Sequence, residues 1–170
     1  MMKKLTLIAL LLTLLSFPAL AEETALVPAA VSPTALNVPV ALYCGPTQGF
    51  YRHEQQTIDL TAPFVCFGQY DCWAMVAQGT TEAFGPVGYI EGGLFDTATL
   101  PELSFEDSYA AMIEEDAPVT NDPLSPDGAW AMTLPRGTQV VVLAALGDWL
   151  YVQTEIAGTP ARVFVPADAI

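Results

Sequence analysis

The sequence contains very little positive charge. Its two lysines, Lys3 and Lys4, lie at the N-terminus, and beyond them three arginines face 19 acidic residues, so residues 22–170 carry 3 − 19 = −16. A surface this negative repels phosphate backbones and anionic lipid headgroups. We therefore expect neither nucleic acid nor an anionic membrane surface as a partner. The charge favours solubility and would attract a cationic ligand.

Only one long apolar run is present. "MMKK" precedes a run from Leu5 to Leu20, and Ala19-Leu20-Ala21 supplies the small residues that signal peptidase requires. A charged start, a short apolar segment and an A-x-A end are typical of a secretory signal peptide. The run is shorter than a membrane-spanning helix needs. We therefore expect residues 1–21 to be a signal peptide, no membrane span after its cleavage, and a secreted or periplasmic (extracytoplasmic) protein.

Residues suited to catalysis or metal binding are scarce. His53 is the only histidine and no Cys-x-x-Cys spacing occurs, so we expect no metal site. A catalytic couple of Cys44 with His53, nine residues later, is conceivable. The strand-rich segments described below leave no residues for a separate catalytic domain. We therefore expect no catalytic residue, no enzymatic activity and no cofactor.

The three cysteines are an odd number for an exported protein, so at least one thiol is free or pairs between chains. Cys66 and Cys72 flank the turn in "CFGQYDC". A four-residue turn would direct their side chains to opposite faces of the hairpin, whereas a three-residue loop would place them opposite each other. A Cys66–Cys72 disulfide is therefore permitted only by the shorter loop.

No segment shows a helical period over three turns, and short β-branched and aromatic runs alternate with turn residues. This pattern predicts an all-β fold. Residues 22–36, with two prolines, are expected to form a disordered leader. Residues 92–116 are expected to be an acidic linker, in which "YAAMI" (109–113) forms either an added strand or a short helical turn.

The strand pattern occurs twice, in residues 37–91 and in residues 117–170. Trp73 and Trp149 correspond at an offset of 76 residues, and Tyr89-Ile90 matches Phe164-Val165 at 75. An internal repeat of this kind predicts two all-β domains in tandem. Each would have only about sixty residues, a size at which a lone core is marginal, so we expect the two to pack on each other.

The second repeat resembles a known family. "RGTQVVVLAALGDWLYVQ" followed by "RVFVP" is similar to the bacterial SH3-like (SH3b) domain: a Gly-Thr entry, an apolar strand, a Gly-Asp-Trp turn and a closing aromatic-Val strand. The first repeat, with "LYCGPTQGFY" and "FVCFGQYDCWAMVAQ", resembles it less closely, because Thr61-Ala62 replaces Gly-Thr and Tyr70-Asp71-Cys72 replaces Gly-Asp. The resemblance implies two tandem small SH3-like barrels that bind cell-wall peptides or proteins.

The resemblance also implies a ligand groove built from the first loop and the hairpin aromatics. Its expected residues are Tyr43, Phe50, Tyr51, Trp73, Tyr89, Trp130, Trp149, Tyr151 and Phe164. Aromatic walls suit extended peptides, and the acidic neighbours Asp71, Asp148 and Glu82 favour ligands that carry amines. For Trp73 and Trp149 the alternative is a lid that covers the end of a small barrel core.

The favoured interpretation is an exported, non-catalytic binding module that recognises cell-wall peptide or an envelope or secreted protein. The alternative is a structural or assembly subunit of a larger exported complex, with no small ligand. A third hypothesis, a hydrolase that uses Cys44 and His53, has the least support from the sequence.

Overall fold

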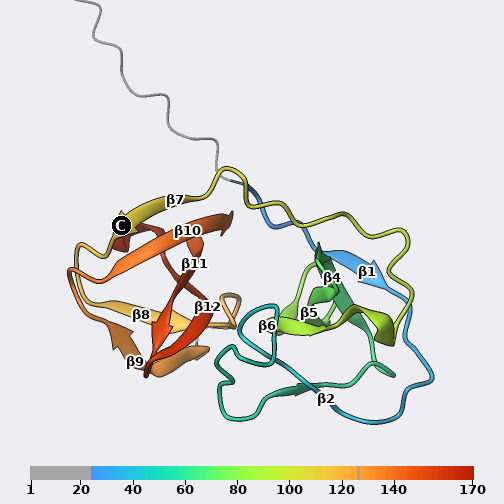
Figure 1. Ribbon diagram of the computed structural model, residues 1–170. Helices are drawn as coiled ribbons and strands as arrows, with labels where there is room; N and C mark the ends of the chain where they lie inside the picture. Colours follow the sequence, from blue (N-terminus) through green and yellow to red (C-terminus); the bar gives the residue numbers. More distant parts are fainter. Residues whose placement is uncertain (1–23, 126) are drawn as a thin grey trace, which may run out of the picture.

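The computed structural model describes residues 24–125 and 127–170, whose regular structure is almost entirely β (Figure 1). These residues form twelve strands and two short 3-10 helices, and no α-helix. The all-β class predicted from the sequence is confirmed. The expected signal peptide lies outside the described residues. Within the described ranges, no helix has the length and apolar character needed to cross a membrane.

The first half of the chain forms a four-stranded antiparallel sheet in the order β1-β4-β5-β6. Its strands are β1 (Ala29–Val31), β4 (Phe64–Tyr70), β5 (Trp73–Gly79) and β6 (Phe84–Glu91). Two short strands, β2 (Val40–Ala41) and β3 (Thr57–Ile58), pair with each other, and the 3-10 helix η1 (Gly92–Leu94) follows β6.

The second half forms a six-stranded sheet in the order β7-β10-β11-β12-β8-β9. Its strands are β7 (Tyr109–Met112), β8 (Ala117–Thr120), β9 (Ala129–Leu134), β10 (Gln139–Leu146), β11 (Trp149–Ile156) and β12 (Thr159–Pro166), followed by the 3-10 helix η2 (Ala167–Ala169). Strand β7 lies within the expected acidic linker, so the segment 109–113 forms a strand and not a helical turn. In the described part of the chain neither sheet closes on itself.

The two halves repeat the same strand pairing. Each central hairpin turns on two residues, since Tyr70 pairs with Trp73 and Leu146 with Trp149. A β-bulge interrupts β4 between residues 66 and 68 and β10 between residues 142 and 144, which is the same place in the repeat. The pairing therefore follows the repeat predicted from the two tryptophans. In both halves the bulge bends the strand and increases its twist.

The N-terminal segment contacts both halves. The Leu26 N–H donates to the Ala145 carbonyl (2.9 Å), and the Ala145 N–H donates to the Thr24 carbonyl (2.8 Å), so this segment lies beside β10 of the second half. The chain then enters β1, which pairs with β4 of the first half. The expectation of a disordered leader over residues 22–36 is wrong for the described residues from Thr24 onward, because Leu26 is buried and β1 is hydrogen-bonded into a sheet.

Residues 101–103, which precede the second half, make the equivalent contact with β4 of the first half. The Gln69 N–H donates to the Pro101 carbonyl (2.9 Å) and the Leu103 N–H to the Gln69 carbonyl (2.5 Å), after which the chain enters β7 of the second half. A Cβ on Gly68 would lie 2.6 Å from the Pro101 carbonyl oxygen, so this close approach requires glycine. In Figure 1 both segments cross between the halves along the top of the molecule. The segment that precedes each half is thus hydrogen-bonded to the sheet of the other half.

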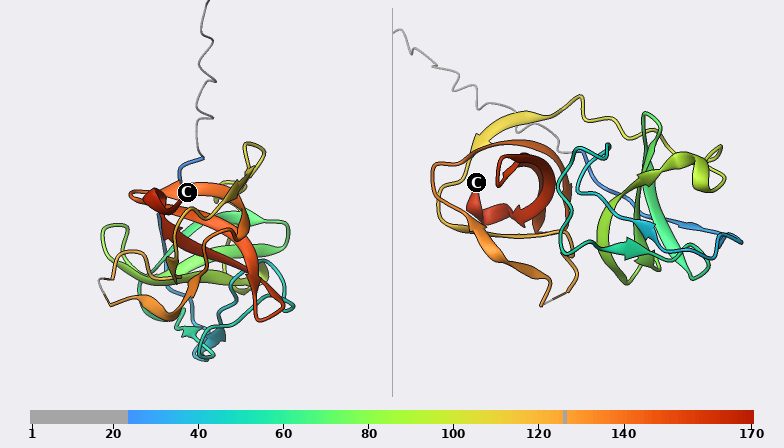
Figure 2. Two further views of the ribbon diagram at one scale, coloured as in Figure 1. Left: turned by 90° about the vertical axis from the view of Figure 1, so that its left-hand side faces the viewer. Right: turned by 60° about the horizontal axis from the view of Figure 1, so that its bottom comes forward.

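The two halves pack side by side through a shared apolar cluster, which we call the interface core (Figure 2). Its buried residues come from both sheets and both exchanged segments: Leu26, Val65, Phe67, Trp73, Met75, Ala77, Phe84, Val87, Tyr89, Leu103, Leu143, Ala144, Tyr151 and Phe164. The opposite face of each sheet covers that half's own core. Since both faces are covered, β4 and β5 each begin with five consecutive buried residues instead of alternating ones.

All three cysteines are free thiols. Cys66 is buried in β4 opposite Val76, whereas Cys72 is exposed in the two-residue turn. This turn is shorter than either of the two turns considered from the sequence, and Asp71 occupies its left-handed position (φ 56°). The Cys66–Cys72 disulfide is therefore not formed, because the register pairs Cys66 with a residue four positions beyond Cys72.

A pair of neighbouring substitutions tests the role of the N-terminal segment. Leu26 is 4% exposed and Val27 is 69% exposed. We expect Leu26→Ala to lower the free energy of unfolding by about 2–4 kcal/mol, as removal of a buried leucine side chain does elsewhere. Val27→Ala should change it by less than about 0.5 kcal/mol. Urea denaturation measures both values, and equal, small effects would show that the segment does not pack as described.

Candidate binding cleft between the two halves

The nine predicted aromatic residues do not line one groove. Tyr89, Tyr151 and Phe164 are 0%, 2% and 0% exposed and belong to the interface core. The rings of Tyr151 and Phe164 pack with centroids 4.8 Å apart. The prediction that these three residues line a ligand groove is therefore wrong, because the opposite half covers the face of the sheet on which they lie.

Trp73 and Trp149 occupy equivalent positions at the start of β5 and β11. Trp73 is 8% exposed and its indole meets the Tyr43 ring edge-on, with centroids 5.7 Å apart. Trp149 is partly buried and packs against the interface core. Tyr43 and Trp73 border a small hollow of about 170 Å³. The burial of Trp73 agrees with the lid alternative more than with an open aromatic wall.

Phe50 belongs to an aromatic box around Arg162 that the sequence did not predict. The guanidinium carbon lies 4.8 Å from the ring centroid of Tyr70, 5.2 Å from that of Phe105, and 5.8 Å from those of Phe50 and Tyr89. Arg162 is only 7% exposed, and no carboxylate of the described residues pairs with it. Its Nη1 donates to Tyr89 Oη (3.3 Å) and its Nε to Gln153 Oε1 (3.1 Å). The ring faces and these acceptors compensate the buried charge.

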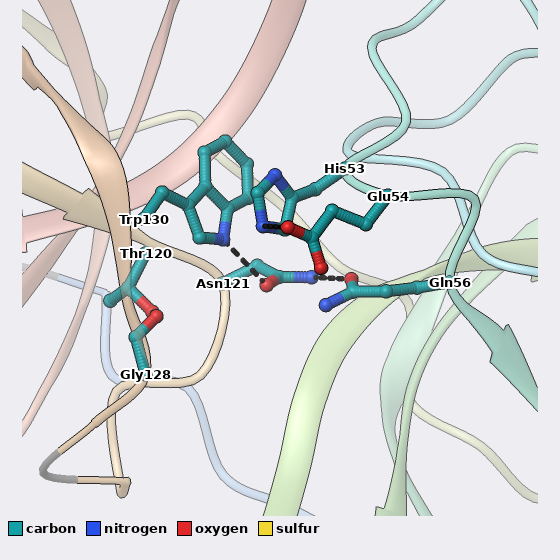
Figure 3. A network of polar contacts seen from close by, with 7 residues as sticks. All are labelled: His53, Glu54, Gln56, Thr120, Asn121, Gly128 and Trp130. Atoms are coloured by element: carbon teal, nitrogen blue, oxygen red, sulfur yellow. Dashed lines mark hydrogen bonds and ion pairs between the residues drawn. The ribbon is translucent and has the colours of Figure 1, made fainter.

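The remaining aromatic prediction, Trp130, lies in a hollow of about 400 Å³ between the two halves, which we call the junction cleft. The first half contributes the loop around His53, and the second contributes the β8–β9 connection and the start of β9. The imidazole of His53 stacks on the indole of Trp130, with centroids 4.1 Å apart and an interplanar angle of 10° (Figure 3). Tyr51 packs beside the same indole at 5.6 Å. These rings form an aromatic wall.

Asn121 fixes this wall in place (Figure 3). The Trp130 Nε1 donates to Asn121 Oδ1 (3.2 Å), and the Asn121 Nδ2 donates to Gln56 Oε1 (2.7 Å) and to the Val87 carbonyl (3.1 Å). Asn121 is 2% exposed, and its bonds to Trp130 and to the Val87 carbonyl are buried, while the bond to Gln56 is partly buried. One amide side chain therefore connects the Trp130 indole to two elements of the first half.

Carboxylates surround the cleft. Glu54 and Asp127 are exposed at its rim, and Asp122 is partly buried within it. Asp122 Oδ1 is buried without a hydrogen-bond partner among the described residues. Burial raises the pKa of this carboxyl, although a hydrogen bond from the Ser125 backbone opposes the shift. The cleft therefore contains a carboxyl group with one oxygen that is covered and unpaired, close to an aromatic wall.

The Cys44–His53 couple considered from the sequence is not assembled. His53 stacks on Trp130, while the Cys44 side chain lies in the core of the second half and is 3% exposed. Burial raises the pKa of the Cys44 thiol to about 11, so it stays protonated at neutral pH. Among residues 24–125 and 127–170, no three histidine, cysteine or acidic side chains converge as a metal site would require.

Sequence analysis missed His53, Gln56, Asn121 and Asp122 as parts of one site. Three contacts join His53, Asn121 and Gln56 to Trp130 or to each other, and Asp122 lines the same cleft, but Gln56 and Asn121 are 65 residues apart in sequence. No local pattern predicts such a contact, because it depends on how the two halves pack. The only signal available was Trp130 itself, which was predicted as a ligand-facing residue and does line the cleft.

The titration of His53 tests the geometry of the wall. Burial lowers the pKa of its imidazole below the ordinary 6.5, and the Glu54 carboxylate partly offsets this shift. We expect the NMR titration of this single histidine to have a midpoint below 6.5, and Glu54→Gln to lower it further. Glu114→Gln, at an exposed site outside the cleft, should leave it unchanged. A wild-type midpoint at or above 6.5 would contradict the stacked arrangement.

The lowered pKa of His53 also makes the stability of the fold depend on pH. Because the folded pKa lies below the unfolded one, the unfolded state binds more protons as the pH falls below about 6.5. The contribution of neutral His53 to stability is therefore complete at higher pH and is lost on acidification.

Comparisons with protein-family models, with curated proteins and with solved structures found no match for this chain. No function can therefore be transferred from a relative.

Proposed function

We propose that this chain is an exported, non-catalytic binding module whose two halves are SH3-like, and that it binds an extended, amine-bearing peptide in the junction cleft. The SH3-like assignment is supported by the Gly-Asp-Trp turn of the second repeat and by the equivalent hairpins and bulges of the two halves. Export is supported by the signal-like residues 1–21.

One observation carries the proposed ligand class: the partly buried Asp122 carboxylate, one oxygen of which has no donor among the described residues, in a cleft walled by His53 and Trp130. An ammonium group held at this carboxylate would supply a hydrogen-bond donor and the opposite charge. His53 covers a face of the Trp130 indole, so the attraction comes from the carboxylates: Asp122 within the cleft, and Glu54 and Asp127 at its rim.

The charge of the protein supports the same ligand class. Residues 22–170 carry 3 − 19 = −16, and Glu54 and Asp127 extend the negative rim of the cleft. This field speeds the approach of cationic ligands and opposes anionic ones. Cell-wall stem peptides with a free side-chain amine, and exposed lysine-bearing segments of exported proteins, both satisfy these requirements.

The alternative function, a structural or assembly subunit without a small ligand, also has an observation in its favour. Four of the nine predicted groove residues, Trp73, Tyr89, Tyr151 and Phe164, are buried members of the interface core, so these aromatic side chains hold the two halves together. An assembly subunit would form a stable complex with an exported protein and would not respond to changes in the junction cleft.

Binding of a synthetic stem peptide with a free lysine side-chain amine tests the proposal. We expect Asp122→Asn to weaken binding at least about tenfold in calorimetric titration, because the substitution removes the charge and keeps the shape. Acetylation of the peptide amine should have a similar effect. Asp148→Asn is the matched control, since Asp148 is an exposed aspartate beside Trp149 and lies outside the cleft.

Two results would overturn the assignment of the cleft. The first is equal binding of the free and acetylated peptides. The second is a loss of affinity in Asp148→Asn that matches or exceeds the loss in Asp122→Asn, which would place the ligand near Trp149 instead.

A further inference from the structure

Strand β7 forms one edge of the six-stranded sheet and pairs only with β10 among the described residues. The Ile113 N–H donates to the Thr138 carbonyl on the β10 side. Since successive backbone groups of a strand point in opposite directions, the N–H and C=O groups of Met112 and Ala110 point away from β10. These groups are placed to pair with a further strand.

The same edge carries an exposed apolar strip. Met112 is 55% exposed and Val141, opposite Ala110 on β10, is 36% exposed. A shallow hollow of about 570 Å³ lies over residues 110–112 and 139–141. Val141 corresponds to Val65, a member of the interface core, so this strip continues the face of the sheet that packs against the other half.

The equivalent edge of the first half is protected. Strand β1 occupies the same place beside β4, with Ala30 opposite Val65 as Ala110 is opposite Val141. It has only three residues, and Pro28 and Pro33 lie on either side of it. Short edge strands and prolines are devices by which proteins prevent further strand pairing. Strand β7 has neither proline nor charge within its length.

The charges around β7 determine what can pair with it. Glu106 and Asp107 precede the strand, and Glu114, Glu115 and Asp116 follow it, and all five are exposed. A second copy of this chain, paired antiparallel through its own β7, would place one acidic group against the other. Like charges that meet in this way oppose pairing. The occupant that fits is a strand with basic residues at both ends.

We propose that β7 is the docking edge for an extended segment of a partner protein, a segment with an apolar centre and basic ends that adds to the sheet beside β7. The backbone groups of Ala110 and Met112 supply hydrogen bonds, the strip at Met112 and Val141 receives apolar side chains, and the acidic flanks select the basic ends. The site is separate from the junction cleft, so it does not depend on the ligand proposed there.

The test uses the full exported chain and a short fluorescent peptide with an alternating Val-Thr centre and a pair of lysines at each end. We expect binding by anisotropy that weakens as salt is raised. Ala110→Pro removes the outward N–H without breaking a bond to β10, and it should reduce affinity at least about tenfold. The matched substitution Ala30→Pro on β1 should leave affinity unchanged.

A second variant and a second peptide make the test independent of folding defects. Met112→Lys alters an exposed side chain and should also weaken binding at least about tenfold, since it adds positive charge to the edge. The same peptide with glutamates in place of lysines should bind at least about tenfold more weakly to the wild-type protein.

Three results would overturn the proposal. One is equal binding to wild-type protein and to a Met112→Lys protein whose circular dichroism is unchanged. Another is equal binding of the lysine and glutamate peptides. The third is a concentration-dependent dimer that Ala110→Pro abolishes, because it would make a second copy the occupant.

Discussion

The packing of two sheets through the interface core is the constraint on which the rest of the structure depends. Each sheet covers its own core with one face and the opposite half with the other, so large side chains such as Tyr89 and Phe164 have no exposure to water. A domain of about sixty residues buries too little surface to be more than marginally stable alone. The exchanged segments with Leu26 and Leu103 add to the shared cluster from both directions.

Polar contacts between the halves follow the same repeat. The Arg162 N–H donates to the Cys44 carbonyl and the Val87 N–H to the Asn121 carbonyl, each at 2.6 Å, and these two bonds are equivalents in the two halves. The side chains have diverged. On one side the Arg162 guanidinium fills an aromatic box, and on the other Asn121 anchors the Trp130 wall. The junction cleft therefore lies at one of two equivalent places between the halves, and the side chains at the two places differ.

The sequence was sufficient to predict the all-β class and the position of both tryptophans after a tight turn, whereas for the segment 109–113 it left a strand and a short helical turn open. It could not predict the roles of Tyr89, Tyr151 and Phe164, because a strand pattern shows which residues are apolar and not whether solvent or a second sheet covers them. The order of residues 24–31 was missed for a related reason, since their partners lie in distant strands. The state of Cys66 depended on a bulge and a two-residue turn, which spacing alone does not determine.

Differential scanning calorimetry of the protein without its signal-like segment tests the shared core most directly. If the two halves form one cooperative unit, the protein will unfold in a single transition whose calorimetric and van't Hoff enthalpies agree. Two separate transitions, or a van't Hoff enthalpy near half of the calorimetric value measured, would show that the halves fold independently and would contradict a shared core as the basis of the fold.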